Sequence, residues 1–466
     1  MICWPRYLAV SLCLLSAAPG FGEQEAVSPP VPQEPDATGE VDGADPREED
    51  IDVVDFGQEK EPTPERESPA DVAEEGQSRS GYDELEQFGG PRSVGGKLKR
   101  ADKTKRSRFG LGKLDRAFEP WFRIKERIKE QHGLSFGVIY KGLYQGAGDS
   151  PGEDEAAGGV FQFLGSWALV GSGRTEGSLA FLFENRHRLG TALSPEDLGG
   201  ALGSAVSTGT DFSGFGATLS RLYWRQGLSQ GRVVFVAGRV DPGDYVDTHP
   251  LNDPLTTALN ESLVASPTIG GPEPGLGGAF AVFPGSKIYL IAGFSDANGS
   301  FTRAGFDTFL EDREYFKHFE IGWIPSYEKR FTDNVHLTAW HADERESAET
   351  PEGWGLNFSL ARTLSERFVP YLRMGWAHGG LAALEATVAT GLGVEFSKGD
   401  QLGVGTSWGR PAERALRDQR TVEVFYRLHV TSDFAVTPNV QVIFNPAANP
   451  AESSIVVYSL RAGIPF

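Results

Sequence analysis

Few residues in this chain have the types and spacing that could carry out a reaction. The stretch GTSWG (405–409) has the glycine-x-serine-x-glycine spacing of a serine nucleophile. That motif needs a sharp turn from a strand into a helix, which holds the hydroxyl exposed. Ser407 instead lies in a glycine-rich alternating segment with no helical pattern after it. The stretch GLGG (275–278) likewise lacks the strand–helix context of a dinucleotide site. We interpret both as chance matches.

Patterns that could bind a metal are equally weak. His336 and His341 are five positions apart, and an odd spacing puts two residues on opposite faces of a strand. Asp241, Asp244 and Asp247 could supply the oxygen ligands that Ca²⁺ prefers, although solvated acidic side chains are commoner in loops. We therefore expect no metal, no cofactor and no catalytic residue, and we predict that the protein is not an enzyme.

Charge is distributed very unevenly along the 466 residues, whose formal net charge is -20. Residues 23–90 hold 22 Asp and Glu against 4 Lys and Arg, whereas residues 91–132 hold 14 Lys and Arg against 5 Asp and Glu. An acidic protein is repelled by a nucleic-acid backbone, so we expect no nucleic-acid partner. The short basic stretch suits anionic lipid headgroups instead.

The first 133 residues divide into three segments by composition. Residues 1–22 have a basic start, a short apolar core and small residues, which together predict a secretory signal peptide. Both cysteines lie within it, so the mature chain would have no disulfide and no reactive thiol. Residues 23–108 are rich in Glu, Asp, Pro and Ser and are predicted to be a disordered periplasmic segment. Residues 109–133 predict a short amphipathic helix, with Trp121, Ile124 and Ile128 on one face.

From residue 134 to residue 466 the pattern changes to alternating strands. About sixteen segments of roughly 8 to 14 residues have strand character and are bounded by turn residues. In RTVEVFYRLHVTS (420–432), apolar residues fall on one parity and mostly polar residues on the other. A period of two places the two sets on opposite faces of a sheet.

The lengths of the connections between these segments alternate. Six short connections separate six longer ones, which are 188–213, 242–275, 297–314, 343–352, 409–419 and 446–453. Transmembrane barrels combine short periplasmic turns with long external loops. We therefore predict an all-β fold, a 16-stranded antiparallel transmembrane β-barrel over residues 134–466, preceded by the amphipathic helix and the disordered tail.

The last ten residues, VYSLRAGIPF, agree with a closed barrel. Tyr458, Leu460, Ala462, Ile464 and Phe466 share one parity, which we expect to face lipid. Closure requires the last strand to pair with the first, since no open sheet edge is tolerated in a bilayer. A chain that ends on a strand fits such a seam.

Two stretches resemble a known family. VVFVAGRVDPGDYVDTHPLNDP (233–254) and RTVEVFYRLHVTSDFAVTPNVQVIFNPAANP (420–450) are similar to the fifth-strand region and the C-terminal strand pair of the carbohydrate-selective porins of Gram-negative outer membranes. The resemblance implies a sixteen-stranded channel that passes sugars. It also implies that Phe466 is presented to the barrel-assembly machinery, and it leaves open whether three barrels associate as a homotrimer.

A barrel of this size leaves an aqueous channel, so its selectivity depends on what narrows it. The connection 242–275 is the longest, and we expect it to fold inward and build the constriction. The residues predicted to line the pore or contact the solute are Arg239, Asp241, Asp244, Tyr245, Asp247, His249, Arg373, Glu423, Arg427 and Arg461. The alternative for each Arg and Glu is that it braces the wall through ion pairs.

The function that follows is passive, substrate-selective diffusion of mono- and small oligosaccharides across the outer membrane of a Gram-negative-type bacterium. One alternative is a general porin with a preference for anions or cations. A second alternative is a secreted soluble β protein that binds glycans. Small sugars and outer-membrane lipid are the partners that the first hypothesis requires.

Overall fold

The structure is a computed structural model that describes residues 89–102, 112–148, 150–327, 329–396, 399–431 and 433–465. All of them belong to one compact unit, Pro69–Phe466. The predicted signal peptide, most of the segment 23–108 and the terminal Phe466 lie outside the described residues.

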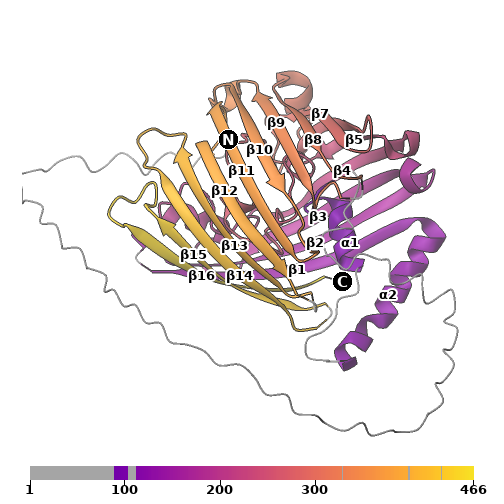
Figure 1. Ribbon diagram of the computed structural model, residues 1–466, viewed down its shortest axis with the longest axis horizontal. Coiled ribbons are helices and arrows are strands. Elements are labelled where there is room, and N and C mark those ends of the chain that lie inside the picture. Colours follow the sequence, from indigo (N-terminus) through magenta and orange to yellow (C-terminus); the bar gives the residue numbers. More distant parts are fainter. Residues whose placement is uncertain are drawn as a thin grey trace, which may run out of the picture. The chain divides into compact units, whose positions relative to one another are not determined.

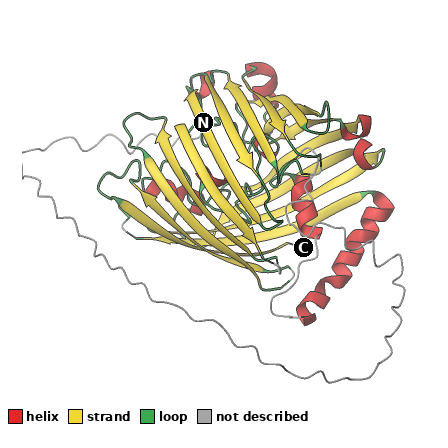
Figure 2. Ribbon diagram, viewed as in Figure 1, coloured by secondary structure: helices red, strands yellow, loops and turns green. Residues whose placement is uncertain are grey.

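The described residues form sixteen strands that close into one antiparallel barrel (Figures 1 and 2). Each strand pairs with the next along the chain, and β1 pairs with β16 from Ile139 opposite Pro465 to Ala147 opposite Val457. The predicted 16-stranded fold is therefore confirmed. The strands are β1 Leu134–Ala147, β2 Glu155–Val170, β3 Gly177–Arg188, β4 Gly216–Leu228, β5 Val233–Val240, β6 Gly275–Val282, β7 Ile288–Asp296, β8 Tyr315–Trp323, β9 Asn334–Ala342, β10 Gly353–Ala361, β11 Phe368–Gly379, β12 Leu384–Glu395, β13 Gln401–Pro411, β14 Gln419–His429, β15 Ala435–Phe444 and β16 Ser454–Pro465.

Apolar and polar side chains alternate across the barrel wall as the period of two requires. On β16, Tyr458 and Leu460 are 60% and 50% exposed, whereas Val457 and Arg461 are buried. The exposed parity carries large apolar side chains all round the barrel, from Phe163 on β2 to Leu460 on β16. This outer face is the one that suits lipid, and the buried parity faces the interior.

The connections follow the predicted rhythm, with two departures. Connections at one end are mostly short, for example 229–232 and 283–287, and those at the other end include 189–215, 241–274 and 297–314. The departures are a longer connection between β8 and β9 at the short end and a tight one between β11 and β12 at the long end. The overall asymmetry matches periplasmic turns and external loops.

Helix α2, Gly112–His132, lies within the range predicted for the amphipathic helix and contacts the outside of β1. The Trp121 ring meets the Phe136 ring edge-on at 5.6 Å, and Trp167 donates a hydrogen bond to the His132 carbonyl at 2.9 Å. Gly133 then adopts φ +67°, a left-handed conformation that ends the helix at low cost. None of the helices in the described ranges is both long and apolar enough to cross a bilayer.

Helix α1, Val94–Asp102, corrects one prediction. It falls inside the segment 23–108 that composition predicts to be disordered, so that prediction is wrong for these residues. The helix contacts β1, β2 and β3 and buries Val94, Leu98 and Ala101. Its apolar spacing is that of one helix face, and the barrel supplies the surface that covers it.

The long connections contain the remaining short helices. These are α3 Pro195–Ala201, α4 Glu261–Val264, the 3₁₀ turn η3 Pro242–Asp244, the π turn η4 Thr308–Asp312 and the 3₁₀ turn η5 Glu346–Ala348, while η1 Gly173–Thr175 and η2 Ser229–Gly231 lie in short turns. The largest group of buried apolar side chains lies inside the barrel and includes Val94, Leu98, Leu164, Leu182, Val234 and Ile291. Apolar side chains of α1 and of the wall strands therefore pack against one another inside the barrel.

Candidate functional site

The connection between β5 and β6, residues 241–274, crosses the inside of the barrel, and we call it the lumenal loop. Inward-facing residues of three distant strands hold it: Glu320 on β8 accepts from the Asp247 N–H at 2.7 Å, Glu423 on β14 accepts from the Asn260 N–H at 2.9 Å, and Arg461 on β16 donates to the Thr257 carbonyl at 2.8 Å. Because β8 lies far around the barrel from β14 and β16, the loop spans the lumen.

Asp247 is the anchor of the first half of the lumenal loop. Its carboxylate accepts a hydrogen bond from Arg373 on β11 and lies 3.1 Å from His336 Nε2 on β9. Burial alone would raise the pKa of Asp247, but Arg373 and His336 hold it well below its ordinary value. A buried carboxylate without partners is destabilising. The contacts with Arg373 and His336 therefore hold this part of the lumenal loop against the wall.

Glu423 anchors the second half. Its carboxylate accepts the N–H groups of Leu259 at 2.6 Å and Asn260 at 2.9 Å, together with the side-chain amide of Asn439. All of these groups are buried. The two N–H groups precede the short helix α4, where Asn260 is the capping residue and accepts from the Ser262 N–H at 3.2 Å. Glu423 therefore holds this turn of backbone at the wall, together with Gln441 on β15, whose side-chain oxygen accepts from the Asn260 side-chain amide at 3.2 Å.

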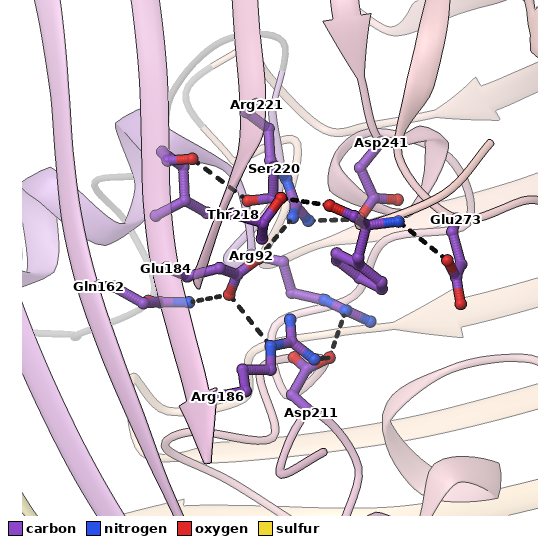
Figure 3. A network of polar contacts seen from close by, with 12 residues as sticks. Arg92, Gln162, Glu184, Arg186, Asp211, Thr218, Ser220, Arg221, Asp241 and Glu273 are labelled. Carbon is purple, nitrogen blue, oxygen red and sulfur yellow. Dashed lines mark hydrogen bonds and ion pairs between the residues drawn. The ribbon is translucent and has the colours of Figure 1, made fainter. Parts of the chain in front are cut away.

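A cluster of buried charges fills the lumen beside β3 and β4. We call it the charge cluster; its members are Glu184, Arg186, Asp211, Arg221, Asp241 and Asp244. Arg221 lies at its centre, with Glu184 Oε1 at 3.4 Å, Asp244 Oδ1 at 3.2 Å and Asp241 in contact. Arg186 bonds Glu184 at 3.1 Å and lies 3.4 Å from Asp211 (Figure 3).

Segment 89–102 extends this network from inside the barrel. Arg92 pairs with Asp211 at 3.0 Å, Lys97 Nζ donates to Gln162 Oε1 at 3.1 Å, and Arg100 pairs with Asp253 of the lumenal loop at 2.5 Å. Gln162 in turn donates to Glu184 at 3.2 Å, which joins Lys97 to the charge cluster. The segment is thus bonded to both the wall and the loop.

Most of the predicted site residues meet in this interior. Asp241, Asp244, Tyr245, Asp247 and His249 are buried in the lumenal loop, and Arg373, Glu423 and Arg461 face inward from the wall and hold that loop. Arg427 has the inward parity of Glu423 and is half-buried. Their role toward a solute remains a prediction, because the contacts described here are made within the chain.

Arg239 is a correction. In the ladder it stands opposite Leu222 of β4 and Leu276 of β6, and paired residues share one face. Leu222 is 40% exposed on the outer face, so Arg239 faces outward and not into the pore. Its guanidinium donates to the carbonyls of Ser300 and Arg303 in the connection 297–314, the latter at 2.7 Å.

Sequence patterns did not single out four members of the charge cluster, Glu184, Arg186, Asp211 and Arg221, or a role for segment 89–102. The sequence of β3 does contain a usable pattern. Glu184 and Arg186 fall on the parity opposite to Phe183, which predicts a polar face toward the interior. Arg221 lies next to an irregularity in the β3–β4 ladder, between Leu182 and Phe183, which shifts the parity of β4. That shift is a property of the pairing and is not visible in β4 itself.

The two short glycine motifs and the two histidines lie within strands β13, β6 and β9. Ser407 sits within β13 opposite Ala389 and Thr421, and is buried. His336 is buried against Asp247, whereas His341 is exposed near Asp343, so the two histidines do occupy opposite faces. Within the described ranges there is no group of three or more His, Cys, Asp or Glu residues suited to a metal.

Gly375 allows a test of how the lumenal loop is seated. A Cβ there would overlap Thr268 of the loop and the amide of Asn357, which are hydrogen-bonded to each other at 2.6 Å. We expect Gly375→Ala to lower the free energy of unfolding by about 1–3 kcal/mol, because the loop must move away from β10 and β11. Thermal unfolding of the detergent-solubilised barrel measures this.

Gly285 is the matched control, since no atom lies within 4 Å of the Cβ that Gly285→Ala would add. The change there should stay within about 0.5 kcal/mol. Equal unfolding temperatures for the two variants would contradict the seating of Thr268 against Gly375.

Three comparisons with known proteins agree with this geometry. The model of the family described as "Carbohydrate-selective porin, OprB family" matches residues 372–466. A protein named Porin AaxA from Chlamydia felis is 24% identical over 271 residues, and its namesake from Chlamydia abortus is 25% identical over 271 residues. Each alignment covers 54% of this chain and 59% or 58% of the relative. The chain thus spans less than two thirds of the length of these relatives.

A solved structure, the high-pH structure of Pseudomonas putida OprB, is similar in fold. It aligns over 78% of this chain and 99% of its own with a TM-score of 0.61 and 14% sequence identity. The similarity to carbohydrate-selective porins that the stretch 420–450 indicates is confirmed by the family match, and the porin fold is confirmed by the structural match.

Proposed function

We propose that this chain, which resembles the carbohydrate-selective porins of the OprB family and has the porin fold, lets small carbohydrates diffuse passively across the outer membrane of a Gram-negative-type bacterium. The observation that carries the proposal is the lumenal loop, which is fixed across a barrel of porin size by Asp247 and by residues around Asn260. A loop held in this way narrows the pore to a constriction that selects by contact. Porins are channels, so the proposed function requires no chemical step.

The groups at the constriction suit an uncharged, hydroxyl-rich solute. Carboxylates supply hydrogen-bond acceptors and guanidinium groups supply donors. Because the two kinds of group are paired at short distance, their charges largely cancel. Aromatic rings lie among them: the His249 ring is 4.8 Å from the Tyr371 ring, and Phe425 faces inward on β14. Aromatic rings can pack against the C–H side of a sugar, but these three are buried by neighbouring side chains, so a sugar would reach them only where the loop moves aside.

Partners other than the solute also belong to this proposal. The exposed apolar parity would contact outer-membrane lipid. Association of three barrels and recognition of the C-terminus by the barrel-assembly machinery follow from the family resemblance alone. Phe466, on which the second depends, lies outside the described residues.

Liposome swelling tests the proposal. Vesicles that contain the full mature chain should swell in isosmotic monosaccharide and disaccharide solutions, and added sugar should reduce the ion current through single channels. Deleting residues 244–272 should raise the conductance and abolish the reduction by sugar, because the constriction is gone. An ion current that sugars leave unchanged, with a strong reversal potential in a salt gradient, would instead support an ion-preferring porin. Detergent-free solubility of the chain would support the soluble glycan-binding alternative.

A further inference from the structure

Helix α1 occupies the barrel interior near the end with short connections (Figure 1). Val94 is fully buried and Leu98 is 5% exposed, and both belong to one apolar cluster with inward-facing residues of the wall. Those wall residues include Ile139, Leu164, Ala180 and Leu182. A water-filled channel has a polar wall, so an apolar inward face on β1, β2 and β3 indicates a surface that is built to be covered.

Charge gives a second, independent indication. The charge cluster contains four carboxylates, Glu184, Asp211, Asp241 and Asp244, but only two cations, Arg186 and Arg221. Arg92 and Lys97 bring the number of cations to four, through Asp211 and through Gln162. Buried charges require partners, and segment 89–102 supplies part of the positive charge that these carboxylates face.

The segment is also fastened to the lumenal loop. The Gly90 N–H donates to the Asp244 carbonyl at 2.6 Å, and Arg100 joins Asp253 at 2.5 Å. Burial raises the pKa of Asp253, but Arg100 and Lys97 outweigh it and hold the pKa below its ordinary value. The wall and the lumenal loop thus both contact this cationic helix, which lies between them.

We propose that residues 89–102 are an internal plug: the lumen contains a docking site for this cationic segment, and solute passes only after the segment has withdrawn. This inference rests on the proposed porin function and adds its regulation. Withdrawal uncovers the passage beside β1 to β3. It also removes Arg92 and Lys97 from beside the carboxylates of the charge cluster, so the open channel attracts cations at its wall.

Planar-bilayer recordings on the full chain test the plug. Val94→Asp with Leu98→Asp places two carboxylates on the apolar wall beside the charge cluster, which expels the segment. We expect the open probability to rise at least tenfold over the unaltered chain, with a reversal potential shifted toward cation selectivity. Arg100→Glu should act in the same direction and avoids the apolar core. Ile124→Asp on α2, an apolar side chain that is 46% exposed, is the control and should change neither quantity.

A reversible lock makes the test sharper. A Cβ at position 90 would lie 2.8 Å from Thr248 Cβ, so Gly90→Cys with Thr248→Cys can form a disulfide after a small relaxation. Both native cysteines, at positions 3 and 13, lie within the predicted signal peptide. Added to the Val94→Asp/Leu98→Asp variant, the oxidised pair should keep the channel closed, and a reductant should open it.

The outcomes separate the plug from the sugar-porin function. The unaltered chain should let sugar enter slowly, through transient withdrawal of the segment. If the oxidised lock conducts and supports swelling in sugar as well as its reduced form does, the plug is refuted and the porin function stands. If release opens an ion current but no sugar enters the vesicles, the plug stands and the carbohydrate function falls. If Arg100→Glu and the double Asp variant remain closed while they migrate as folded barrels on unheated gels, the plug is refuted.

Discussion

Replacing Arg221 with methionine should lower the free energy of unfolding by about 3–5 kcal/mol, the cost of removing one member from a buried ion network. Arg221 is 2% exposed and contacts Glu184, Asp241 and Asp244 at once. Methionine keeps much of the volume and removes the cation, so three buried carboxylates lose a shared partner. Thermal unfolding in detergent and the temperature at which the folded gel band disappears measure the loss.

The deficit of this variant should shrink as the pH falls from 7 to about 5. Burial raises the pKa of Asp244 to about 6, even with Arg221 beside it. A carboxyl whose folded pKa lies above its unfolded value is stabilised by protonation, so its contribution to stability rises as pH falls through that range. Without Arg221 the uptake of a proton removes the unpaired charge, and the variant recovers part of its stability.

Arg410→Met is the matched control for Arg221→Met. Arg410 also pairs with a carboxylate, Asp418, at 3.4 Å, but the two side chains are 52% and 43% exposed. An exposed pair contributes about 0–1 kcal/mol, so the same chemical change should have little effect. Similar losses at the two sites, or a loss at Arg221 that does not depend on pH, would contradict the account of the charge cluster.

The barrel was predictable from the sequence because its signals are local and repeated. The period of two in β16 places Tyr458 and Leu460 on one face whatever the neighbouring strand does. Loop length is likewise visible in the chain, and the longest connection does fold inward. Both properties depend on one segment at a time.

The wrong prediction for Arg239 concerns the face of a side chain, which depends on how two neighbouring strands pair. Arg239 and Asp241 share one parity, which we expected to face inward, whereas the ladder with Leu222 and Leu276 turns Arg239 outward. Asp241 can reach Arg221 only because β5 has ended and the chain is free to turn inward. Parity holds within a strand and gives no information beyond its last paired residue.

Helix α1 was missed for a related reason. Val94, Leu98 and Ala101 have the spacing of a helix face, but nine residues are too few for a stable isolated helix. The acidic composition of residues 23–90 also dominates any average over the segment. What stabilises α1 is its contact with the inside of β1, β2 and β3, and that surface exists only once the barrel has closed.

Glu423 decides between the two roles that sequence leaves open for the inward-facing Arg and Glu residues. If Glu423 braces the lumenal loop, Glu423→Ala removes the acceptor of the Leu259 and Asn260 N–H groups and of the Asn439 amide. Hydrogen bonds to a charged group contribute about 1.5–3 kcal/mol each, and buried donors left without acceptors add to the cost. We therefore expect a loss of roughly 3–5 kcal/mol in stability, together with a larger and noisier single-channel current because α4 is no longer held at the wall.

Glu423→Gln separates bracing from solute binding, because the amide has the same shape and keeps one oxygen acceptor while losing the charge. A bracing role predicts an intermediate loss of stability, a conductance near that of the unaltered chain and an unchanged reduction of current by sugar. A direct solute contact predicts the reverse: stability nearly unchanged and a much weaker effect of sugar. Since the carboxylate already accepts from three groups of the chain, little of it is left for a passing hydroxyl. The first result is the one we expect, and it would move the search for solute contacts to inward-facing residues that are less buried, such as Arg427.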